Sequence, residues 1–259
     1  MNSILWIILF FLLLFIGRQR GVKTFFTFLL SMILIITYII LMALGFNAIT
    51  LALIICVLAS LISIFMLNGY SNKTKSAFIG VMVVLFIIFV LIYIIGKRAK
   101  IGGFGDEALE TIGAFNFDIN YNMTNVIIGM FLVSAIGTII DTSISVATAM
   151  NEVLENNPKI KEKELYKSGM NVGADILSTT INTLYFALIS TFIGFFMWHR
   201  TISIESLINY KVFTQNIILL LITFIASILI IPITSFISSR VLLNKKIYSF
   251  KKIKRWINE

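Results

Sequence analysis

Long uncharged apolar runs constrain this chain more than any other feature. Residues 24–47 and 76–96 contain no charged side chain, and about 20 apolar residues are enough for a helix to cross the hydrocarbon core of a bilayer. Charged residues make up 13% of the chain, whereas soluble domains usually carry about 25%. The chain is therefore predicted to be all-α, a polytopic bundle of transmembrane helices with no room for a water-soluble catalytic domain.

The apolar runs predict about seven spans. These spans cover residues 3–17, 24–45, 48–68, 77–96, 125–150, 171–197 and 213–236. The first run is short, lacks a basic segment before it and an A-x-A-like cleavage site, and has its basic flank after it. We therefore expect a retained helix and not a cleaved signal peptide. The turn at Gly45-Phe46-Asn47 predicts a helical hairpin between the second and third spans.

The basic residues predict the orientation. Seven spans put the termini on opposite sides of the membrane. With the C-terminus inside, segments 17–23, 69–76, 151–170 and 237–259 hold 3, 2, 4 and 7 Lys and Arg, and the outer segments hold 5. The positive-inside rule then favours N-out and C-in in a bacterial cytoplasmic membrane. If the first span lies in the interface instead, the N-terminus moves inside and the rest is unchanged.

Four regions differ in character. They are an aliphatic four-helix membrane region (1–96), an extracytoplasmic loop with an interfacial helix (97–124), a polar-lined three-helix membrane region (125–236) and a basic cytoplasmic tail (237–259). The glycine cluster of the loop lacks the Lys-Ser/Thr ending of a phosphate-binding loop. The tail is expected to lie on anionic lipid, although a plain stop-transfer flank explains its composition equally well.

Only two acidic residues fall within predicted spans, Asp141 and Asp175. An ionised carboxylate is costly in lipid, so such a residue faces the bundle interior or water, or is protonated. Helical spacing groups these residues with other small and polar side chains. One face of the fifth span carries Ser134, Gly137, Thr138, Asp141, Ser145, Thr148 and Glu152, and one face of the sixth carries Asn171, Asp175, Ser178, Thr179 and Asn182.

If these two spans pack antiparallel, both polar faces are expected to line one hydrated cleft that opens toward the cytoplasm. Two like charges in a low-dielectric cleft repel, which favours proton uptake by one of them, and this permits proton or ion coupling. The candidate coupling residues are Asp141, Asp175, Ser145, Thr138, Asn171, Thr179 and Asn182. Gly137 and Gly173 are candidates for close helix packing. A hydrogen-bonded packing seam is the alternative, with Asp175 simply hydrated near the interface.

Other classes of function find less support. Cys56 stands alone in an apolar run and His199 has no ligand partners, so no metal or cofactor is expected. The net charge of +9 lies beside apolar runs, as topology signals do, and no nucleic-acid partner is expected. The weakest alternative is an intramembrane aspartyl protease, because its GxGD-type motif requires glycine where Ala174 stands. We therefore expect no enzyme.

The segment 133–188 resembles the YibE/F family of bacterial membrane proteins. The residues that carry the resemblance are Gly137, Asp141, Ser145, Glu152, Asn157, Pro158, Ser168, Gly169, Met170, Asn171, Gly173, Asp175, Asn182 and Thr183. The glycine-rich loop 101–113 is similar as well, whereas the first four spans match only in hydrophobicity. At Ala174 the chain departs from the family, in which a basic residue commonly precedes the aspartate. The resemblance is to the shorter member of two-gene pairs, which implies a longer family member or a second copy as partner.

A fainter similarity links the same segment to the fourth and fifth helices of RND transporters and of SecD/SecF export proteins. It implies a proton-coupling role for Asp141, with Thr142 where RND pumps have a second aspartate. Two functions therefore stay open. One is a transporter-like subunit in which Asp141 couples protons or ions, and the other is a non-transporting scaffold in a two-component complex.

Overall fold

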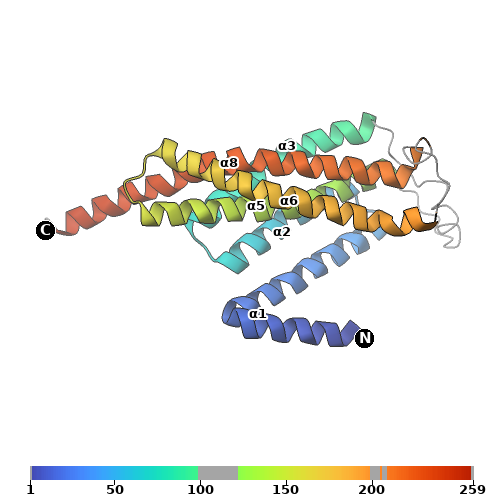
Figure 1. Cartoon of the computed structure of the whole chain (residues 1–259), viewed down its shortest axis with the longest axis horizontal. Coiled ribbons are helices and arrows are strands. Elements are labelled where there is room, and N and C mark those ends of the chain that lie inside the picture. The colour runs from blue at the N-terminus through green and yellow to red at the C-terminus, as the bar shows by residue number, and fades with distance from the viewer. Residues whose placement is uncertain (1, 99–121, 199–204, 206–208, 258–259) are drawn as a thin grey trace.

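The computed structural model describes residues 2–98, 122–198, 205 and 209–257, which form a bundle of long helices (Figure 1). The elements are α1 (Asn2–Ala43), α2 (Ala48–Leu61), the π-helix η1 (Ile62–Met66), α3 (Asn72–Arg98), α5 (Met123–Asn156), α6 (Glu162–Trp198) and α8 (Lys211–Ile257). Within these ranges there is no strand, and six helices, with α2 and η1 taken together, are long and apolar enough to cross a membrane. The all-α transmembrane prediction is confirmed.

The first two predicted spans are two arms of α1. Arg18, with φ 47° and ψ −128°, interrupts the helical backbone between them. The arms contact each other through aromatic rings, with centroid distances of 5.7 Å for Trp6 and Phe28 and 4.9 Å for Phe10 and Phe25. Figure 1 shows the arms doubling back, so that the N-terminus points away from the end of the bundle that holds the C-terminus. The expected count of about seven spans is therefore close.

Local sequence signals account for the helix boundaries in the front half. Gly45 adopts a φ of 91° after the end of α1, a conformation that glycine tolerates best. The Asn47 side chain then accepts hydrogen bonds from the backbone N–H groups of Ile49 and Thr50 and caps α2. This is the hairpin predicted at residues 45–47. The predicted loop 97–124 lies almost entirely outside the described residues, and the predicted tail continues α8 as helix to residue 257.

α5 lies at the centre of the bundle, in contact with α2, α3, α6 and α8. Its buried faces carry large apolar side chains such as Phe131, Leu132 and Ile139, which pack into one core with Ile88 and Ile92 of α3. α6 contacts only α5 and α8 among the described helices, and it is the least buried of the six candidate spans. The bundle therefore leaves one of its most polar helices largely uncovered.

α6 and α8 approach closely through glycine. Gly169 and Gly173 are one turn apart on α6, and a Cβ at Gly173 would overlap the side chain of Ile231 on α8. A Cβ at Gly169 would lie 2.7 Å from the Ser235 Oγ. A Gly-x-x-x-Gly spacing lets two helices in lipid approach until their backbones nearly touch. Gly173 therefore lies at a close helix contact, as a packing role requires.

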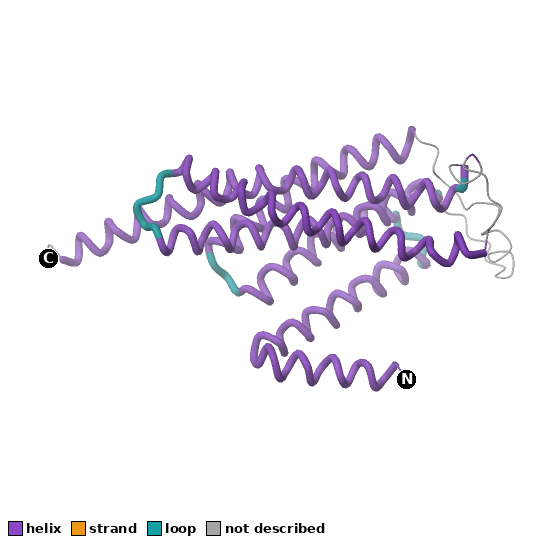
Figure 2. Tube along the Cα trace, viewed as in Figure 1, coloured by secondary structure: helices purple, strands orange, loops and turns teal. Residues whose placement is uncertain are grey.

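The basic segments gather at one end of the bundle. Figure 2 shows the connection before α3 and the connection between α5 and α6 at the end that holds the C-terminus. Lys73 and Lys75 open α3 there, and Lys159 and Lys161 lie in or next to the α5–α6 connection. This grouping is the arrangement that the predicted N-out and C-in orientation requires.

The α6–α8 contact predicts a stability effect. Gly173→Leu should lower the free energy of unfolding by about 2 kcal/mol, because the new side chain overpacks against Ile231. Ala187→Leu, at an exposed position on the same helix, is the matched control and should change little. Thermal unfolding of both variants in detergent measures the difference, and equal midpoints would contradict the contact.

The orientation can be tested with a membrane-impermeant thiol reagent. Phe46→Cys is exposed at the α1–α2 turn and Tyr70→Cys at the opposite end, so intact cells should label only the first variant. Permeabilised cells should label both. The native chain is the blank, since its single cysteine, Cys56, is buried. Labelling of only Tyr70→Cys in intact cells would reverse the orientation.

Candidate functional site

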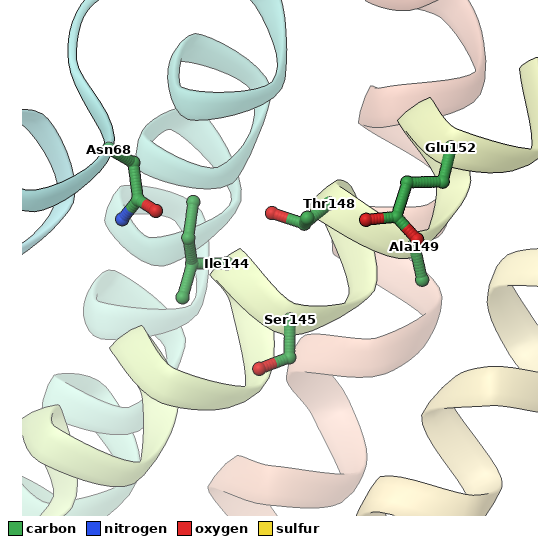
Figure 3. Close-up of a pocket in the computed structure, with 6 residues that line it drawn as sticks. All are labelled: Asn68, Ile144, Ser145, Thr148, Ala149 and Glu152. Atoms are coloured by element: carbon green, nitrogen blue, oxygen red, sulfur yellow. The ribbon is translucent and has the colours of Figure 1, made fainter. Parts of the chain in front are cut away.

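A pocket of about 340 Å³ lies between α5 and the segment that follows η1. It is lined by Asn68, Ile144, Ser145, Thr148, Ala149 and Glu152. In Figure 3, Asn68 lies across the space from the α5 side chains, and the Thr148 hydroxyl points toward it. The pocket is at the end of the bundle that carries the basic segments, which is the predicted cytoplasmic end.

Helical geometry places the polar lining of this pocket. Ser145, Thr148 and Glu152 are spaced three and four residues apart, so they share one face of α5. Asn68 follows the π-helix η1 and donates from Nδ2 to the Ile64 carbonyl at 3.4 Å. π-Helical turns often occur at functional sites. Asn68 is not among the residues predicted from the sequence, although a polar residue at the end of a predicted span, before Gly69, was an available signal.

The α5 side chains in the pocket have unused hydrogen-bonding capacity. Within the described part of the chain, the Ser145 and Thr148 hydroxyls and the Glu152 carboxylate make no hydrogen bond. Two hydroxyls and a carboxylate offer oxygen ligands or a proton relay to whatever enters the pocket. The Asn68 side-chain carbonyl adds a further acceptor.

Asp141 lies on the same face of α5, one turn beyond Ser145, and its side chain is exposed. Ser134 and Gly137 are exposed further along this face, and Thr138 is half-buried. We call the face from Ser134 to Glu152 the α5 polar stripe. It runs from the pocket toward the middle of the helix and points out of the bundle, because the other faces of α5 pack against α2, α3 and α8.

The polar face of α6 is exposed as well. Its exposed members are Asn171, Asp175, Ser178, Thr179 and Asn182, which we call the α6 polar stripe. The expected cleft between the two stripes is therefore not closed within one chain. Of the predicted coupling residues only Ser145 lines the pocket, whose far wall is Asn68 instead of α6. The reason is that α6 uses its glycine face, and not its polar face, to contact α8.

Helix contacts set the depth of the two aspartates. Gly80 of α3 lies near Ser143 and Thr234, and Gly173 lies against Ile231. At 1.5 Å of rise per residue, Asp141 is about 10 Å inside the uncharged stretch 76–96 of α3, and Asp175 lies within about 5 Å of the same depth. Glu152 is about 16 Å closer to the cytoplasmic end along α5. Both aspartates therefore lie at the depth of the hydrocarbon core.

Comparison with known families decides the identity. Residues 5–244 match the family model of YibE/F-like proteins. The chain belongs to this family. The match runs from the first arm of α1 to α8, well beyond the segment 133–188 that carried the resemblance in sequence. No curated protein and no solved structure matched the chain, so the similarity to the RND and SecD/SecF helices stays a prediction.

This YibE/F-like protein also has a buried hydroxyl seam that the sequence analysis missed. The Ser143 hydroxyl donates to the Ala77 carbonyl at 3.0 Å and lies 2.9 Å from the Thr234 hydroxyl. Ser238 donates to Ser76 at 3.0 Å. These bonds join α3, α5 and α8 at buried positions. The available signal was the run of Ser and Thr at helical spacing in residues 234–239.

The seam also contains unused polar atoms. The hydroxyls of Thr142 and Ser235 are buried and lack a partner among the described residues.

The two predicted packing glycines differ: Gly173 contacts α8, whereas a Cβ at Gly137 would meet nothing within 4 Å. Gly137 therefore makes no close packing contact with the described part of the chain. His199 lies outside the described residues, within which no group of three or more His, Cys, Asp or Glu is placed to hold a metal.

Two neighbouring serines of α5 should separate structure from function. Ser143→Ala removes two buried hydrogen bonds and should lower the free energy of unfolding by about 1 kcal/mol. Ser145→Ala removes a hydroxyl without a partner and should leave stability unchanged. Thermal unfolding in detergent measures both, and an equal loss in Ser145→Ala would show that the pocket hydroxyl is also structural.

Proposed function

We propose that this multipass YibE/F-like protein is a transporter-like subunit of the bacterial cytoplasmic membrane, in which Asp141 couples proton or small-cation movement. The observation that carries the proposal is the position of Asp141. It is a carboxylate at the depth of the hydrocarbon core, on a polar stripe that is continuous with a pocket at the cytoplasmic end. Ionisable residues at such depth often mark ion and proton pathways, because the free-energy cost of a charge in lipid disfavours them where they have no function.

The α5 polar stripe supplies the parts that a proton or cation pathway needs. Glu152 is an exposed carboxylate in the lining of the pocket and can attract a cation or exchange a proton with water. Thr148 and Ser145 follow, each about one turn deeper, and their free hydroxyls can both donate and accept. Asp141 is next along the same face. Groups one turn apart are close enough to be bridged by single water molecules.

Asp175 can assist Asp141 in this pathway. It lies near the depth of Asp141 on the neighbouring helix, and its exposed neighbours are Asn171, Ser178 and Thr179. Its side chain adds a second carboxylate to the pathway at nearly the same depth as Asp141. No cation lies within the described spans 126–150 and 170–193 to balance either charge.

One observation favours a second function, that of a non-transporting scaffold for another membrane protein. α6 is the least buried candidate span and presents polar side chains outward. A scaffold needs such a binding face, but it does not need a titrating carboxylate. The two functions therefore differ in what they predict for the exchange of Asp141 for its neutral isostere.

Proton flux into liposomes tests the proposal. Purified protein is reconstituted with an internal pH-sensitive dye, and a potassium diffusion potential drives the flux. Asp141→Asn keeps the side-chain shape but removes titration, and should reduce the flux by about 100-fold. Glu152→Gln should reduce it less, because water at this exposed position can replace the carboxylate.

The matched control is Glu155→Gln. Glu155 is exposed on the same helix end and accepts a hydrogen bond from Asn151, outside the pocket, so its flux should equal that of the native chain. Sodium- and potassium-sensitive dyes extend the assay to small cations. If the native protein moves none of the three ions, transport fails as the function and the scaffold remains.

A further inference from the structure

The exposed position of Asp141 and Asp175 conflicts with a lipid environment. Both carboxylates point out of the bundle at the depth of the hydrocarbon core, where an unpaired charge costs several kcal/mol. The described spans offer no cation at this depth, since residues 76–96, 126–150, 170–193 and 213–239 contain no Lys, Arg or His. A second polar surface over the two stripes would remove this cost by supplying hydrogen-bond donors.

Gly137 gives independent support for a close neighbour. Among the described glycines of α3, α5 and α6, Gly80, Gly96, Gly129, Gly169 and Gly173 each lie where a Cβ would crowd another helix, whereas Gly137 has nothing within 4 Å. Glycine in a helix interior costs about 1 kcal/mol relative to alanine. A glycine in the centre of an outward polar stripe is suited to a helix that approaches from outside the chain.

The two stripes also match each other in depth and chemistry. The contacts of α3 with α5, and of α8 with α3 and α6, place Thr179 at the depth of Ser134. In this register the Asn171 amide of the α6 stripe lies near the depth of Asp141, and the Thr138 hydroxyl of the α5 stripe lies near the depth of Asp175. In a two-fold interface, a surface that contacts a second surface of the other copy must also be contacted in return. Here the α5 stripe of each copy would contact the α6 stripe of the other. Adjacent α5 and α6 stripes at equal depth meet this requirement.

We infer that the α5 and α6 polar stripes form the interface between two copies of this chain, related by a two-fold axis along the membrane normal. In this arrangement the α5 stripe of one copy lies against the α6 stripe of the other. The amide and hydroxyl donors of each copy then satisfy the carboxylates of its partner. The inference rests on the proposed function only in one respect: the pathway past Asp141 is enclosed between the copies.

Disulfide cross-linking between differently tagged copies tests this interface. Ser134→Cys in one chain and Thr179→Cys in the other are produced together in a host without other members of the family. Mild oxidation of the membranes should give a product that carries both tags. Ser178→Cys replaces Thr179→Cys if that variant does not fold, since Ser178 is also exposed on the α6 stripe.

The matched control is Val90→Cys, paired with Thr179→Cys. Val90 is 42% exposed on α3. Gly96 of α3 contacts Ile128 of α5, and Val90 and Ser134 are equally far along their helices from that contact, so both lie at the same depth. Its cross-linked yield should be several-fold lower than that of Ser134→Cys. The native chain is the blank, since Cys56 is buried. Equal yields, or a product formed only after another family member is added, would overturn the inference.

The mass of the purified chain in lipid nanodiscs gives a second readout. Two copies per particle are expected, and Gly137→Leu should shift the particles to one copy without lowering the unfolding midpoint of the single chain, because none of the described residues lies near that glycine. Cross-linking without ion flux would refute the proposed function alone. Ion flux from a chain that is monomeric and does not cross-link would refute the interface alone.

Discussion

The bundle depends on close contact at small residues, because lipid removes the hydrophobic drive that holds soluble helices together. α8 shows this most clearly. On one side it receives Gly169 and Gly173 of α6, and on another its Thr234 meets Gly80 of α3. Ser143 then joins α5 to the same place by two hydrogen bonds. The position of α5, and so the direction of its polar stripe, follows from these contacts.

The buried hydroxyl seam and the α5 polar stripe therefore lie on different faces of α5 and have different roles. The seam around Ser143 is buried, and its hydrogen bonds close between α3, α5 and α8. The stripe from Ser134 to Glu152 has open hydrogen-bonding capacity and faces outward. The paired hydroxyls of the seam stabilise the fold, although Thr142 and Ser235 in it lack a partner among the described residues, whereas unsatisfied groups on an outward face at membrane depth require a ligand, water or a partner.

The sequence predicted the helices and the polar faces, but not the direction of those faces. Uncharged runs and the Asn47 cap locate spans, because span length and capping are local properties. Helical spacing also grouped Asp141 with Ser145 correctly. The direction of that group depends on which other face of α5 packs more closely, and that follows from contacts such as Ser143 with Ala77 and Thr234. A single helix carries no record of its neighbours, so the spacing of the α8 hydroxyls and the place of Asn68 at a span end could not show which side chains they meet.

The direction of the stripe changes which charges interact. The expected repulsion between Asp141 and Asp175 assumed one cleft within one chain. In the inferred two-fold arrangement, Asp141 lies against the α6 stripe of the other copy, and Asp175 of that copy lies within about 5 Å of its depth. Four carboxylates then lie near one level of the membrane, and the described spans hold no cation at that level. Their hydrogen-bond donors come from the other copy, so assembly and coupling depend on the same residues.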